Sequence, residues 1–155
     1  MLEIASNVMQ EAILDANKGL GSHLSTMAGK YLEEISGGKY SDVIVPRDLN
    51  IEAKALNSSQ FYEWKYLSGG AIDRLYLALR LAITDIIARD NQPLPLLLDD
   101  IFTQYDDENC MLAFKFLFKY LKESDSLSQI MFFTCHKHIA QMAKETFDAL
   151  NDISL

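Results

Sequence analysis

The stretch that decides the fold is Leu94-Pro95-Leu96-Leu97-Leu98-Asp99-Asp100-Ile101-Phe102, in which a hydrophobic run passes directly into two adjacent carboxylates. A short, continuous apolar run is typical of a strand in a parallel sheet that helices cover on both faces. In open α/β sheets, ligands bind beyond the carboxyl ends of the strands, where Asp99 and Asp100 would emerge. Two carboxylates there favour Mg²⁺ carrying nucleotide phosphates. Taken alone, the stretch fits a core strand with a polar end equally well.

Composition and charge limit the kind of protein. The 155 residues form one domain, 49% hydrophobic and 23% charged, as in soluble globular proteins. No apolar run is long enough to cross a bilayer and no signal peptide is evident, so we expect a cytoplasmic protein. The net charge of −8 argues against a broad surface that binds nucleic acid, because such a surface needs clustered Lys and Arg. A local basic patch stays open. Cys110 and Cys135 lack C-x-x-C spacing, which indicates reduced cysteines and no zinc site.

The N-terminal region, residues 1–36, has apolar residues at helical spacing. It predicts one helix over residues 2–35, or two in line with a bend at Gly19 and Gly21. A helix of that length spans about 50 Å, more than a compact domain of this size needs. Two arrangements stay open: the helix lies wholly on the sheet of its own domain, or part of it projects and packs on a partner helix.

The remaining residues, 37–155, predict an α/β lobe. Gly37 and Gly38 end the long helix, and residues 40–45, 49–55 and 61–66 read as strands of a small antiparallel layer. Ser68 is a good N-cap for a buried helix over residues 71–89. Its free N–H groups and the neighbouring glycines suit a phosphate, although such sequences are also ordinary helix starts.

The pattern of strand, polar residues and helix then occurs twice. After the two aspartates, residues 103–106 predict a polar turn, with Asp106 or Asp107 capping a helix that reaches Leu121. After a loop over residues 124–128, residues 129–134 predict a second buried strand, which ends in Cys135-His136. A histidine at the end of a neighbouring parallel strand would lie beside the two aspartates, within reach of the same ligand. The alternative is that it has a purely structural role. Residues 139–147 predict a last helix that begins near an exposed His138, and residues 152–155 a frayed end or edge strand; neither His138 nor His23 receives a role.

This order of features resembles the ABC-type ATPase head, a P-loop NTPase, and within it the C-terminal lobe of the SMC-like group, which includes structural maintenance of chromosomes proteins, RecN and YhaN-like AAA ATPases. The resemblance covers residues 28–143, and residues 75–82 and 133–136 are closest to the YhaN-like branch. By the same resemblance, the helix in residues 1–36 is similar to the end of the returning arm of a coiled coil. Four motifs carry it: the signature Leu67-Ser68-Gly69-Gly70, Walker B at Leu96 to Asp100, the D-loop at Thr103 to Asp106, and the switch histidine in Thr134-Cys135-His136.

The resemblance implies a role for each site residue. Asp99 would hold Mg²⁺, Asp100 would orient or deprotonate the attacking water, and His136 would contact the γ-phosphate of ATP. Asp106 would lie at the interface between two heads. The remaining residues would bind the γ-phosphate of a nucleotide held by the opposite subunit: Ser68, Gly69 and Gly70.

Three departures from the family pattern bear on activity. Asp100 replaces the usual glutamate, which sets the carboxylate back by about 1.5 Å. Ala71 replaces the Gln or Glu that often follows the signature glycines. The P-loop pattern GxxxxGK[ST] is absent, since Gly29-Lys30 and Gly38-Lys39 are each followed by tyrosine. We therefore expect half of a nucleotide site, which an N-terminal P-loop lobe of the same or a partner protein completes.

The function that follows from the resemblance is Mg-ATP hydrolysis in a head dimer, in DNA repair, recombination or defence, with DNA bound through the full-length protein. The isolated chain would be inactive. One rival is a non-catalytic interaction module that docks on another ATPase head. A transporter nucleotide-binding subunit is a weaker rival, because a long helix directly precedes the sheet.

Overall fold

The computed structural model describes residues 2–46, 48, 50–88, 92–147 and 153, with only the helical backbone described for residues 2–18. Arg47 of the predicted turn, Leu49 of the predicted strand, residues 89–91, and residues 152, 154 and 155 of the predicted C-terminal end lie outside this part. In chain order the elements are α1 (Leu2–Ile35), β1 (Tyr40–Ile44), β2 (Glu52–Ala55), β3 (Phe61–Glu63), the 3-10 helix η1 (Trp64–Tyr66), α2 (Gly69–Ile87), β4 (Leu94–Asp99), α3 (Asp107–Glu123), β5 (Leu127–Phe133) and α4 (Lys137–Thr146).

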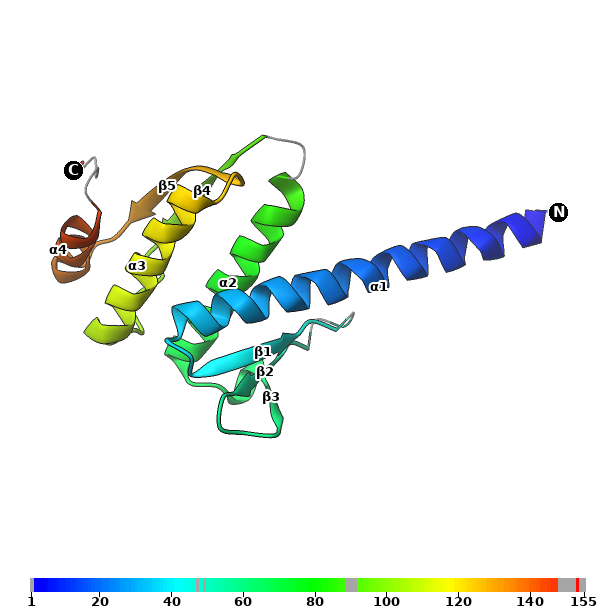
Figure 1. Cartoon of the computed structure of the whole chain (residues 1–155), viewed down its shortest axis with the longest axis horizontal. Coiled ribbons are helices and arrows are strands. Elements are labelled where there is room, and N and C mark those ends of the chain that lie inside the picture. The colour runs from blue at the N-terminus through cyan, green and yellow to red at the C-terminus, as the bar shows by residue number, and fades with distance from the viewer. Residues whose placement is uncertain (1, 47, 49, 89–91, 148–152, 154–155) are drawn as a thin grey trace.

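Helix α1 is continuous through Gly19 and Gly21, and its N-terminal half projects away from the other elements (Figure 1). The helix therefore does not lie wholly on its own domain, and its packing on a partner helix stays a prediction. The C-terminal half packs on β1, where a Cβ atom at Gly29 would lie 3.3 Å from the backbone nitrogen of Val43. None of the described helices is both long and apolar enough to cross a membrane.

The small sheet has the strand order β1-β2-β3, and both pairs are antiparallel, as predicted. Its third strand is shorter than the predicted residues 61–66, because η1 replaces the last three residues. The backbone N–H of Trp64 still donates to the carbonyl of Ile51 at 2.8 Å, and the N–H of Leu67 then donates back to the carbonyl of Trp64 at 3.1 Å. This turn directs the chain from the sheet into the start of α2.

Strands β4 and β5 pair in parallel, as predicted, but the prediction that helices cover both faces was wrong. Leu96 and Leu98 are buried, whereas Leu97, on the opposite face, is 53% exposed. In β5 only Leu127 is buried, so the second strand is not the buried strand that we expected. Within the described residues, α3 supports one side of the pair and the other side lies open.

Helix α2 is central but not buried all round. Leu75, Ala78 and Ala82 are buried, in agreement with the prediction of a core helix. The prediction failed for three residues in one stripe of the helix, which are 44–64% exposed: Tyr76, Ile83 and Ile87. Arg80 lies in the same stripe and donates from Nη1 to the carbonyl of Leu97 at 3.1 Å, so the stripe adjoins the open side of β4.

A polar cluster joins the three long helices. The carboxylate of Asp85 on α2 accepts hydrogen bonds from the hydroxyl groups of Tyr31 on α1 and Tyr120 on α3. Burial, followed by the bond to Asp85, raises the pKa of both tyrosines. Since the donors come from different helices, one carboxylate fixes how α1 lies on the body of the lobe.

Replacing Asp85 with alanine should lower the free energy of unfolding by about 1–3 kcal/mol for each hydroxyl left buried without a partner. Asp85→Asn keeps one acceptor oxygen and should lose less. Urea unfolding of both variants checks this, with Asp125→Ala, at an exposed position, as the control. Equal midpoints for the Asp85 and Asp125 variants would contradict the assigned role.

Candidate functional site

The parallel pairing of β4 and β5 brings the polar ends of both strands together. Asp99 is paired with Phe133, and the N–H of Asp100 donates to the carbonyl of Phe133 at 3.0 Å. As a result, ligating atoms of Asp100, Cys135 and His136 all lie within 4.8 Å of one another. The predicted meeting of Asp100 with the histidine of the neighbouring strand is therefore present.

Asp100 is held in an unusual backbone conformation. Its φ of 45° lies in the left-handed region, which residues other than glycine rarely adopt. The carboxylate accepts hydrogen bonds from the backbone N–H of Cys135 at 3.2 Å and from its thiol at 3.4 Å. Hydrogen bonding from the Thr134 side chain, and then from Cys135, lowers the pKa of Asp100. The carboxylate is therefore ionised at neutral pH and oriented by the loop after β5.

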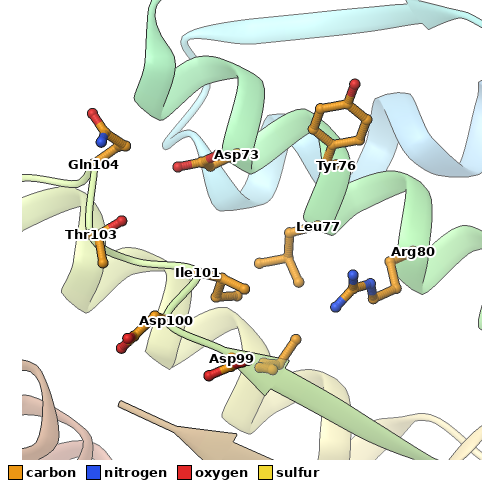
Figure 2. A pocket seen from close by; sticks show the side chains of 10 residues that line it. Asp73, Tyr76, Leu77, Arg80, Asp99, Asp100, Ile101, Thr103 and Gln104 are labelled. Carbon is orange, nitrogen blue, oxygen red and sulfur yellow. The ribbon is translucent and has the colours of Figure 1, made fainter. Parts of the chain in front are cut away.

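A cavity of about 430 Å³ lies between α2 and the segment that follows β4 (Figure 2). Asp99 and Asp100 are on one side, and Asp73 of α2 reaches toward it from the other. Burial raises the pKa of Asp73. Asp73 was not predicted from the sequence, although an acid near the start of a largely apolar helix was a usable signal. The carboxylate oxygens around this cavity are the ligand type that Mg²⁺ prefers.

The start of α2 matches the predicted cap. Ser68 has an extended backbone and its hydroxyl accepts from the N–H of Ala71 at 3.4 Å. A Cβ atom at Gly70 would lie 2.8 Å from the backbone carbonyl oxygen of Gln104, too close for any side chain. At Gly69 the nearest atom belongs to the movable Gln104 side chain, at 3.3 Å. Gly70 is thus required by the approach of the turn at residues 103–106.

A buried arginine links this helix start to Asp106. Arg74 is 7% exposed and donates to the carbonyl of Gly70 at 3.0 Å and to Oδ1 of Asn109 at 2.6 Å. Asn109 in turn donates from Nδ2 to both carboxylate oxygens of Asp106, each at 2.7 Å. Asp106, and not Asp107, caps α3, since its carboxylate also accepts from the N–H of Asn109. These bonds from Asn109 lower the pKa of Asp106.

The predicted site residues therefore form two groups. One is at the strand ends: Asp99, Asp100 and His136. The other is at the start of α2 and the turn beside it: Ser68, Gly69, Gly70 and Asp106. The sequence analysis did not identify Arg74 and Asn109, which organise the second group. A single cation four residues after Gly70, and an amide three residues after the Asp106 cap, were the available signals.

Comparison with known proteins bears on the fold. No protein-family model matches the chain. Over 112 residues it is 27% identical to the uncharacterized protein YhaN of Bacillus subtilis (strain 168), a match that spans 72% of this chain and 11% of the length of that relative.

Solved structures of SMC heads share the fold. A chain from a structural study of ATP-driven dimerization and DNA-stimulated activation of SMC ATPases aligns over 94% of this chain and 82% of its own, with a TM-score of 0.62 and 19% identity. The Smc head domain of Pyrococcus yayanosii, with a coiled coil and joint, aligns over 92% of this chain and 27% of its own. Its TM-score is 0.62 and its sequence identity 22%. The SMC head domain of Thermotoga maritima aligns over 81% of this chain and 41% of its own, with a TM-score of 0.58 and 17% sequence identity. The chain therefore has the α/β fold of the SMC ATPase head, a P-loop NTPase fold, as the four motifs predicted.

Proposed function

We propose that this chain is the C-terminal half of an SMC-like ATPase head, which binds and hydrolyses Mg-ATP once a P-loop lobe and a second head complete the site. The observation that carries the proposal is the meeting of Asp100 and His136 at adjacent ends of parallel strands, within the fold of an SMC head. Asp99 and Asp100 both line the cavity between α2 and the segment that follows β4.

Asp100 is the group that would orient or deprotonate the attacking water. Hydrogen bonds lower the pKa of Asp100 and keep it ionised, which suits a carboxylate that orients the attacking water by accepting a hydrogen bond from it. Cys135 occupies one acceptor position on each carboxylate oxygen and the Thr134 side chain a third, so one of the about four acceptor positions remains for water. His136, on the facing loop, would contact the γ-phosphate.

Asp99 would hold Mg²⁺, which neutralises charge on the transferred phosphoryl group when bound. Asp99 is exposed and lines the cavity, and one carboxylate with waters and phosphate oxygens is the usual coordination of that ion in phosphoryl-transfer sites. ATP is the substrate and Mg²⁺ the only cofactor that this set of residues requires.

The open side of β4 and α2 is the surface on which the P-loop lobe would dock. Leu97, Ile83 and Ile87 are each more than 40% exposed there, an apolar patch that a soluble domain normally covers. The lobe that supplies the missing GxxxxGK[ST] loop would bury this patch and bring its phosphate-binding lysine toward the cavity beside Asp99.

The second head would meet the start of α2. Ser68 and Gly69 are exposed and their loop is held rigidly, so they can reach a γ-phosphate bound by the opposite subunit, with Asp106 at the interface between the heads. ATP-driven dimerization is the subject of the study that yielded one structural neighbour. By the same analogy, the full-length protein would act on DNA in repair, recombination or defence in the cytoplasm.

Calorimetric titration of Mg-ATP into this chain alone should show no binding, whereas a separately made P-loop lobe added to it should produce binding. The reason is that the β-phosphate loop and its lysine lie on the added lobe. Titration into the P-loop lobe alone is the control. Micromolar binding by this chain alone would contradict the half-site assignment.

In the assembled head, Asp100→Asn should lower the rate of ATP hydrolysis by about 10²–10⁴-fold and leave Mg-ATP binding intact, since the amide cannot accept the proton. Asp125→Asn provides a matched control at an exposed position. Unchanged hydrolysis in Asp100→Asn would instead favour a non-catalytic module that docks on another ATPase head.

Gly70→Ala should abolish ATP-dependent dimerization of the assembled heads, because its Cβ atom displaces either the helix start or the turn at Gln104. Gly19→Ala adds the same methyl group where nothing lies within 4 Å and should dimerize normally. Size-exclusion chromatography with light scattering, with and without Mg-ATP, measures both. Normal dimerization of Gly70→Ala would show that this contact is dispensable.

A further inference from the structure

Three side chains with different donor atoms converge at the strand ends. They offer a carboxylate oxygen from Asp100, a sulfur from Cys135 and a ring nitrogen from His136, all within 4.8 Å of one another. The residues come from two segments that the parallel pairing of β4 and β5 holds together. Asp100 and Cys135 are 35 residues apart in the sequence. A search for C-x-x-C spacing therefore could not detect the group.

The group is arranged before any ion arrives. The backbone N–H of Cys135 and the left-handed conformation of Asp100 fix the carboxylate beside the sulfur. The N–H of His136 donates to Oγ1 of Thr134 at 3.1 Å, which sets the direction of the loop. The His136 side chain makes no capping bond to α4, so the imidazole is not committed to the helix start.

The donor set selects a class of metal. Mg²⁺ takes oxygen ligands, whereas one thiolate, one imidazole and one carboxylate suit Zn²⁺ or Co²⁺. Three protein ligands leave the fourth tetrahedral position to water. Cys135 is exposed, which provides a path of entry, and Cys110 is 2% exposed in the core and can take no part.

We propose that Asp100, Cys135 and His136 form a site for a thiophilic divalent transition-metal ion, of which Zn²⁺ is the type. On binding, the thiol proton is released to solvent and the sulfur bonds to the ion, in place of its hydrogen bond to Asp100.

One consequence rests on the proposed function. Asp100 and His136 are also the residues assigned to ATP hydrolysis, so an ion held by them withdraws both from the attacking water and the γ-phosphate. Occupancy of the site would therefore switch hydrolysis off while leaving Ser68, Gly69 and Gly70 free to bind nucleotide.

The test uses Co²⁺ alone with this chain under reducing conditions, without nucleotide or P-loop lobe, so its outcome is independent of the ATPase assignment. Co²⁺ should produce thiolate-to-metal charge-transfer absorption and the visible bands of a tetrahedral site, both removed by Zn²⁺ and unaffected by excess Mg²⁺. Cys135→Ser should abolish the charge-transfer absorption, and Asp100→Asn and His136→Ala should each weaken binding at least tenfold.

Two matched controls separate this site from adventitious binding. Cys110→Ser removes the other thiol, and His138→Ala removes an imidazole whose ring centroid lies 5.9 Å from that of His136. Both should bind Co²⁺ as the unmodified chain does, with circular dichroism confirming that every variant is folded. The proposal is overturned by the absence of charge-transfer absorption, by its persistence in Cys135→Ser, or by an equal loss in either control.

Discussion

The parallel pairing of β4 with β5 is the interaction on which the rest of the site depends. The bond from the N–H of Asp100 to the carbonyl of Phe133 extends the pairing just past the end of β4. At this position Asp100 lies in the left-handed region, and its carboxylate accepts a hydrogen bond from the N–H of Cys135 in the loop after β5. A strained conformation of this kind persists only where the surrounding structure determines it. Here the N–H of Asp100 donates to the carbonyl of Phe133, and the Asp100 carboxylate accepts from the N–H of Cys135.

A second constraint governs the start of α2. Arg74 carries a charge in a buried position, which is costly unless polar groups surround it. Its partners are the carbonyl of Gly70 and the amide of Asn109, and its guanidinium lies 5.5 Å from the ring centre of Tyr105. Since Asn109 also holds Asp106, the helix start and the turn beside it form one rigid unit. Movement of either segment would then be transmitted to the other, which is the behaviour that a head-to-head interface coupled to ATP requires.

Periodicity and motif order predicted most of the fold, because the helices, the antiparallel layer and the parallel pair each have a local signal. Ser68 and Asp106 were recognisable as caps for the same reason. The exposure of Leu97, Ile83 and Ile87 was not predictable, because the residue type alone does not distinguish an apolar side chain in the core from one on an open face. The bond between Arg74 and Asn109 and the bond between Cys135 and Asp100 were missed because each joins residues 35 apart in the sequence, and a local pattern does not indicate such a contact.

The open face also explains why catalysis would be confined to the assembled protein. In the chain by itself, Asp99 is exposed to water, where a single carboxylate attracts a hydrated divalent ion only weakly. A lobe covering Leu97 and the stripe on α2 would exclude water from the cavity and lower the local dielectric constant, which strengthens every interaction of the carboxylates with Mg²⁺ and phosphate. The same apolar burial that joins the lobes would therefore activate the charged groups beside it, so that assembly and nucleotide binding become one coupled equilibrium.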